Sequence, residues 1–229
     1  MRKTHFNSDN LEETAESSVM FTVGSMEKLI IAHDALRDLE RFLTMLFGID
    51  NENKILKDLR GIDYLLQKLS AIYDGNVGSD DQEFYKVLKD TEIGLHVRAC
   101  LLMGTREDCL DYMDAAKAQG GCNPEKELPV KDEDEKSLAV PFTVKDMICL
   151  LRAQYAFRSL EGVLGLFAGT YPEMSFVDGL SRLCDLLENI SPLYDPDYDE
   201  DAEENEEYNI TMASEELSLV ERAKRLMGL

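Results

Sequence analysis

Apolar residues recur at helical spacing along most of the chain. After Thr22, the residues Leu29, Leu36 and Leu43 follow one another at steps of seven, and this spacing predicts an amphipathic helix. Thr22 has the character of an N-terminal cap, and Gly48 stands where a glycine commonly ends a helix. We therefore expect the first helix between these two residues.

A second apolar series, with alternating steps of four and three, runs from Ile55 to Tyr73. It predicts a second helix, antiparallel to the first because the connection between them is short. A third helix is expected over residues 92–104. No segment alternates between apolar and polar residues for long enough to demand a β-strand, so the predicted fold class is all-α.

The chain contains these three predicted helices twice. Residues 21–74 and 142–195 agree at 19 of 54 positions with a constant offset of 121 and no gap. The match resumes at an offset of 124, where residues 92–104 and 216–228 agree at 7 of 13 positions. We interpret the pattern as a tandem duplication of a three-helix module. The copies are expected to pack on each other as a helical bundle or a short solenoid, about an approximate two-fold axis.

The repeat also divides the chain into segments. In order, we expect a flexible N-terminal arm over 1–20, helical module 1 over 21–104, an extra helix over 105–120, an acidic linker over 121–141 and helical module 2 over 142–229. The second module contains an acidic loop at 195–207. Residues 120–141 hold two glycines and three prolines, which makes this stretch the clearest domain boundary.

The chain is strongly acidic, with 46 Asp and Glu against 24 Lys and Arg and a formal net charge of −22. Such a balance opposes direct binding to nucleic acid or to an anionic membrane, because both rely on Lys and Arg. The sequence shows no secretory signal and no apolar run long enough to cross a membrane. Five cysteines without a Cys-x-x-Cys pair favour reduced thiols over zinc or disulfides. We expect a cytoplasmic protein without a metal or cofactor.

Charged residues that both copies share are the main candidates for a site. Glu40 lies in line with the apolar stripe of the first helix, and Glu161 takes the same place in the second copy. A carboxylate in that position needs a partner. The shared arginines are Arg37, Arg98, Arg158 and Arg222. We expect a Glu–Arg clasp in each module that fixes the first helix against the third. The alternative is that the two glutamates meet between the modules, to bind a cation or to act as paired acid and base.

The acidic loop 195–207 resembles a calcium-binding loop in its spacing of oxygen-bearing side chains. Glu200 stands where that pattern requires glycine, so a solvated run of charge that docks a basic partner is the expectation, with cation binding as the alternative. The residues expected to make this contact are Asp197, Asp199, Glu200, Asp201, Glu203 and Glu204. The histidines and cysteines follow no metal-binding or catalytic spacing, and we expect ordinary structural or surface roles for them.

The chain contains no glycine-rich phosphate loop, nucleophile elbow or paired-histidine motif, so no catalytic residue is assigned. We expect a non-catalytic binding protein that docks a basic protein partner. One form of it would be an inhibitor that mimics nucleic acid by presenting carboxylates where phosphates would lie. Two alternatives stay open: an enzyme or small-ligand carrier with a polar pocket between the modules, and a structural subunit that forms a homodimer.

Overall fold

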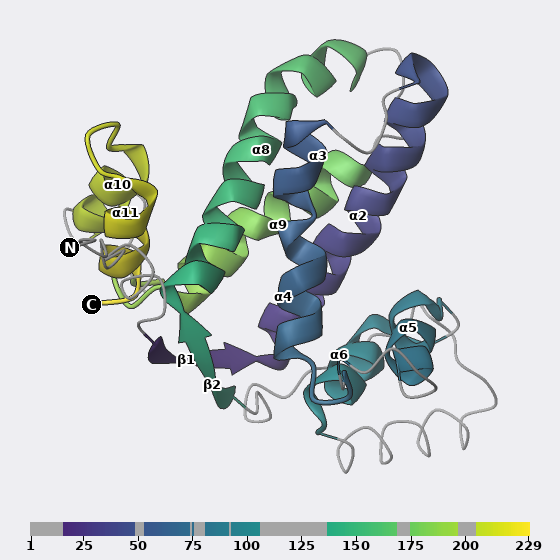
Figure 1. Ribbon diagram of the computed structural model, residues 1–229, viewed down its shortest axis with the longest axis horizontal. Helices are drawn as coiled ribbons and strands as arrows, with labels where there is room; N and C mark the ends of the chain where they lie inside the picture. The colour runs from purple at the N-terminus through teal and green to yellow at the C-terminus, as the bar shows by residue number, and fades with distance from the viewer. Residues whose placement is uncertain are drawn as a thin grey trace, which may run out of the picture.

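The computed structural model of the protein describes residues 16–48, 53–73, 75, 81–91, 93–105, 137–168, 175–196 and 205–229. This part of the chain is mostly helical, as expected, with a small sheet of two strands (Figure 1). The elements are β1 (Glu16–Thr22), α2 (Val23–Phe47), α3 (Lys54–Leu59), α4 (Gly61–Leu69), α5 (Asp81–Lys89), α6 (Leu95–Met103), β2 (Ser137–Thr143), α8 (Val144–Ala168), α9 (Ser175–Ile190), α10 (Glu206–Ala213) and α11 (Leu219–Leu226). We call the described residues 16–105 the first half and 137–229 the second half. The expected extra helix and acidic linker lie almost entirely outside the described residues.

The predicted start and end of the first helix are confirmed. Thr22 is the N-cap of α2, and its hydroxyl accepts a hydrogen bond from the amide of Ser25 at 3.0 Å. Gly48 follows α2 in the left-handed conformation, with φ 59°, which glycine adopts without strain. In the second half, Thr143 and Asp146 cap the start of α8 reciprocally, each side chain accepting from the other residue's amide.

The long helices of the two halves are interleaved. Helix α2 packs mainly on α9, and α8 packs on α3 and α4, so that each half's first helix is covered by the second helix of the other half. The buried apolar residues form one continuous core. In Figure 1 the pair α5 and α6 lies on one flank of this bundle and the pair α10 and α11 on the other. The two halves therefore share one core and do not each close around a core of their own.

The two strands join the halves at the base of the bundle. Strands β1 and β2 are antiparallel, and Val19 pairs with Val140, the residue 121 positions further on. Val19, Phe21 and Phe142 are buried, whereas Met20 faces outward and is 53% exposed. The expectations of no strand and of a loose arm up to residue 20 are wrong. The strands were not recognised because each has seven residues, and so short a segment alternates too few times to be identified without its partner.

The description of each repeated unit as three helices is also wrong. Helix α5 precedes α6, and α10 precedes α11, in stretches where no helix was expected. Helix α5 buries Phe84, Val87 and Leu88 along one face, and this apolar stripe stabilises it against α6. The second helix of the first half is divided at Arg60 into α3 and α4.

The two halves contact each other through a close approach of two helices and through buried hydrogen bonds. A Cβ atom added to Gly179 on α9 would lie 2.5 Å from the Cβ of Ala35 on α2, so glycine is required for this approach. Asp146, fully buried at the start of α8, accepts hydrogen bonds from Lys68 and Tyr64 of α4.

None of the helices in the described ranges has the length and apolar character needed to span a lipid bilayer.

Candidate functional site

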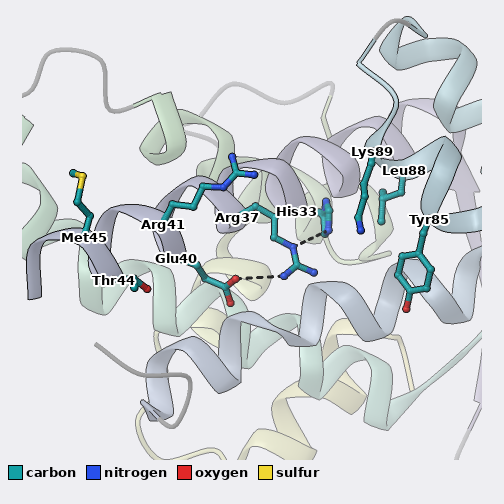
Figure 2. A pocket seen from close by; sticks show the side chains of 9 residues that line it. All are labelled: His33, Arg37, Glu40, Arg41, Thr44, Met45, Tyr85, Leu88 and Lys89. Atoms are coloured by element: carbon teal, nitrogen blue, oxygen red, sulfur yellow. Dashed lines mark hydrogen bonds and ion pairs between the residues drawn. The ribbon is translucent and has the colours of Figure 1, made fainter. Parts of the chain in front are cut away.

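A groove of about 680 Å³ lies between α2 and α5. Its lining residues are His33, Arg37, Glu40, Arg41, Thr44, Met45, Tyr85, Leu88 and Lys89. Figure 2 shows the α2 residues in a row along one side, with Tyr85, Leu88 and Lys89 reaching in from α5. The groove thus forms where the unpredicted helix α5 packs near the first helix of the repeated unit.

The groove is more basic than the protein as a whole. Three of its side chains, those of Arg37, Arg41 and Lys89, are cationic, and Glu40 is the one carboxylate that lines it. Lys89 lies over the ring of Tyr85, with its ammonium group 5.5 Å from the ring centroid, and makes no ion pair with another described residue. Such a set of cations favours an anionic ligand, since phosphate and carboxylate groups bind Arg and Lys through charge-assisted hydrogen bonds.

Arg37 is the centre of a polar network at the floor of the groove. Its guanidinium donates to Nε2 of His33, to Glu40 and to Asp63, each at 3.4 Å. These hydrogen bonds are long, and the Arg37 side chain is 45% exposed, so the guanidinium can also donate to a ligand in the groove. Figure 2 shows it between His33 and Glu40, while Arg41 points away from it.

The buried His33 is held in one tautomer by this network. Because Arg37 donates to Nε2, that nitrogen is an acceptor, and the ring proton resides on Nδ1, which donates to Asp34 at 3.1 Å. The nearby Oδ1 atom of Asp63, 3.6 Å from Nε2, is buried and accepts no hydrogen bond from a described residue. His33 therefore orients Arg37, which agrees with the structural role expected for it.

The predicted clasp between the first and third helices does not use Glu40. This carboxylate instead pairs with Arg60, at the junction of α3 and α4, at 2.8 Å, and with Arg37 on its own helix. Arg98, its expected partner on α6, is buried and bonded to Asp34. Glu40 lies near the core, as expected, but α4 packs on α2 as well, and the residue that reaches Glu40 is Arg60 at the start of α4.

Arg98 and Arg222 have a shared role that the sequence did not suggest. Arg98 donates to the carbonyl oxygens of Val87 and Leu88, at the end of α5. Arg222 donates to the carbonyl oxygen of Met212, the residue equivalent to Leu88, and to that of Ser214. Each arginine thus satisfies carbonyl groups that the preceding helix leaves without an amide donor. The acceptors are backbone atoms, so residue types give no sign of them.

The remaining predicted residues do not meet at a common site. Arg158 and Glu161 are exposed on α8 and form no ion pair with any described residue. Glu40 lines the groove and Glu161 does not. The acidic-loop residues 197–204 lie outside the described residues. Within the described ranges, no group of three His, Cys, Asp or Glu side chains is placed to hold a metal ion.

Two residues of the groove, Tyr85 and Lys89, were not among the predicted candidates. Both lie on α5, in a stretch where no helix was expected, although the apolar series Phe84, Val87 and Leu88 is a signal for a helix there.

The fold and the groove define a mostly helical protein with a basic, ligand-sized groove on its surface. No protein-family model, curated protein or solved structure matches the chain.

Proposed function

We propose that the protein is a non-catalytic binding protein that docks a basic protein partner through its acidic segments. The observation that supports this is the distribution of charge. The described residues contain 21 acidic and 17 basic side chains, a net charge of −4, which leaves 25 of the 46 acidic and 7 of the 24 basic residues for the other segments. Most of the net charge of −22 thus belongs to short stretches of sequence, where it can attract a basic surface over a Debye length.

The scaffold for these segments is, in our proposal, a duplicated unit. Helix α2 and helix α8 differ by 121 in both first and last residue. The hydroxyl of Ser70 donates to the carbonyl oxygen of Leu102, and that of its equivalent Ser191 donates to the carbonyl oxygen of Leu226. Together with the pairing of Val19 and Val140, these repeated contacts support an internal two-fold arrangement of two equivalent units, in which α3 and α4 together correspond to α9.

The experiment is affinity capture from the cells of origin with two variants of equal charge. In the first, the six acidic residues of segment 197–204 are replaced by Asn or Gln. In the second, the matched control, six exposed carboxylates of the described residues are replaced in the same way. The six control positions are Glu83, Asp178, Glu206, Glu207, Glu215 and Glu216.

A basic partner should be retained by the wild type and the control and lost by the first variant. It should also elute as salt rises from about 0.05 to about 0.5 M, because surface charge interactions are screened. Equal capture by all three proteins, or capture that is insensitive to salt, would contradict the proposal.

A second candidate function, supported by the three cations of the groove, is binding of a small anionic ligand. Pyrophosphate is a suitable probe, with affinity measured by calorimetry. Lys89→Ala should weaken binding about tenfold, the effect of one charge-assisted contact. Lys86→Ala is the matched control, because Lys86 is exposed on the same helix and does not line the groove. Equal affinities for the two variants would exclude the groove as the binding site.

A further inference from the structure

A thiol, an imidazole and a carboxylate meet where α6 packs on the start of α2. His96 and Cys100 are one turn apart on α6, and Sγ of Cys100 lies 3.7 Å from Nε2 of His96. The other ring nitrogen, Nδ1, lies 2.8 Å from Oε1 of Glu27 on α2. The order is that of an activated nucleophile: a thiol, a base within hydrogen-bonding reach of it, and a third group that orients the base.

We propose that Cys100, His96 and Glu27 form a nucleophilic thiol site that accepts a small electrophile covalently. His96 takes the proton of the Cys100 thiol, and Glu27 holds the ring in position and stabilises the imidazolium that results. The site goes beyond the binding function proposed above, and it requires no turnover. It lies apart from the α2–α5 groove, whose lining includes none of the three residues.

The electrostatics of the site agree with this assignment. The hydrogen bonds that a protonated His96 donates to Cys100 and to Glu27 outweigh the effect of partial burial and raise the pKa of His96 to about 10. The dipole of α6 gives no help, because Cys100 lies in the C-terminal half of the helix, where a negative charge is disfavoured. His96 is the cationic group within hydrogen-bonding reach of the thiol, so its removal is the perturbation that tests the assignment.

The second half of the chain provides an internal comparison. The positions equivalent to Glu27, His96 and Cys100 are Ile148, Val220 and Lys224. Helix α11 nevertheless packs on α8 as α6 packs on α2. The polar trio is thus not needed to hold this pair of helices together, and a chemical role accounts for its presence in the first half.

The burial of the thiol limits the size of the reagent. Cys100 is 3% exposed, whereas the side chain of His96 is 48% exposed and forms the rim of the site. A small, uncharged electrophile such as iodoacetamide is therefore the suitable probe. In its reaction the Cys100 thiolate attacks the methylene carbon, an S–C bond forms, the C–I bond breaks and iodide leaves with the electron pair. The thiol proton remains on His96.

The test uses full-length protein in which Cys109, Cys122, Cys149 and Cys184 are replaced by serine, so that Cys100 is the remaining thiol. Alkylation by iodoacetamide is followed by intact-protein mass spectrometry from pH 5 to pH 9. At pH 6 an ordinary thiol is about 0.3% thiolate. Full ionisation of the thiol would raise the alkylation rate about 300-fold relative to free cysteine. The lower intrinsic nucleophilicity of a thiolate with a low pKa reduces that rate about 30-fold. Cys100 should then react about tenfold faster than free cysteine, with a rate nearly independent of pH.

Two variants and a control protein with a different remaining cysteine test whether the reactivity of Cys100 depends on His96 and Glu27. In His96→Gln the rate should rise about tenfold per pH unit below pH 8, as for an ordinary thiol, and Glu27→Gln should lie between this and the parent. A protein that retains Cys149 alone is the matched control, since burial raises the pKa of that thiol and its rate should rise with pH. Far-UV circular dichroism confirms that each variant is folded. A Cys100 rate that rises with pH equally in parent and His96→Gln overturns the proposal. Modification that occurs only after addition of urea also overturns it.

Discussion

Gly179→Ala tests the interleaved packing of the two halves directly. Gly179 lies on α9, and a methyl group at this position would stand 2.5 Å from the Cβ of Ala35 on α2. This neighbour is the first atom of a helical side chain, which cannot rotate away. The substitution should therefore force α2 and α9 apart, and these are helices of different halves.

The expected magnitude follows from two opposing effects. Ordinary contacts between carbon atoms lie near 3.5–4.0 Å, so the helices must separate by about 1 Å, and overpacking of this kind costs about 1–3 kcal/mol. The higher helix propensity of alanine offsets about 1 kcal/mol of that. We expect a net loss of up to about 2 kcal/mol in the free energy of unfolding. Gly162→Ala on α8 is the matched control, because nothing lies within 4 Å of its added methyl group, and it should gain about 0.5–1 kcal/mol.

The measurement is urea unfolding followed by far-UV circular dichroism, with linear extrapolation to water. The double variant Gly179→Ala with Ala35→Gly transfers the methyl group from one helix to the other and should recover most of the loss. A double-mutant cycle then gives the coupling between the two positions. If Gly179→Ala is stabilised as much as Gly162→Ala, or if Ala35→Gly gives no recovery, α2 and α9 do not pack as described.

Three further predictions concern the polar network of the first half. Arg98→Met should cost about 2–4 kcal/mol in urea unfolding, because carbonyl groups at the end of α5 and the Oδ2 atom of Asp34 lose the hydrogen bonds that Arg98 donates; a loss below 1 kcal/mol would contradict that role. Glu40→Gln should cost only about 1 kcal/mol, since its arginine partners are partly exposed, whereas a loss above 3 kcal/mol would favour the buried clasp. Burial raises the pKa of Asp34, but hydrogen bonds from His33 and Arg98 outweigh this and lower the pKa overall. Its contribution to stability is thus present above the unfolded-state pKa near 3.9 and lost as the pH falls through the lower folded-state pKa. The stability difference between wild type and Asp34→Asn should accordingly shrink between about pH 5 and pH 2, and a constant difference would refute the reasoning.

The long helices could be predicted because their signals are local. Thr22 and Gly48 mark the two ends of α2, and the chemistry of such caps depends only on neighbouring residues. The partner of each helix could not be predicted in this way. Leu36 is buried by the apolar surface of another helix, and the helical period does not indicate whether that helix belongs to the same half or to the other half. Strand β1 was missed for a related reason, since its hydrogen-bond partner lies beyond a long stretch of sequence.

The candidate sites were predictable only in part. Glu40 and Arg37 were recognised because both copies have them, and both line the groove. The comparison between copies cannot reveal residues that only one half has, and Lys89, Tyr85, His96 and Cys100 belong to this class. For the thiol site a local signal existed, because a spacing of four places His96 and Cys100 on the same face of a helix. The carboxylate of Glu27, 69 residues away, enters only through the packing of α6 on α2.

The cover that α9 gives to α2 has a consequence for the making of this protein. The first residue of α9, Ser175, follows the last residue of α2, Phe47, by 128 positions. At a synthesis rate of about 5–20 residues per second, the apolar face of α2 waits roughly 6 to 26 seconds on the ribosome before its cover is made. The apolar face of α2 is therefore open to chaperones during this interval, and its native packing on α9 can form only late in translation.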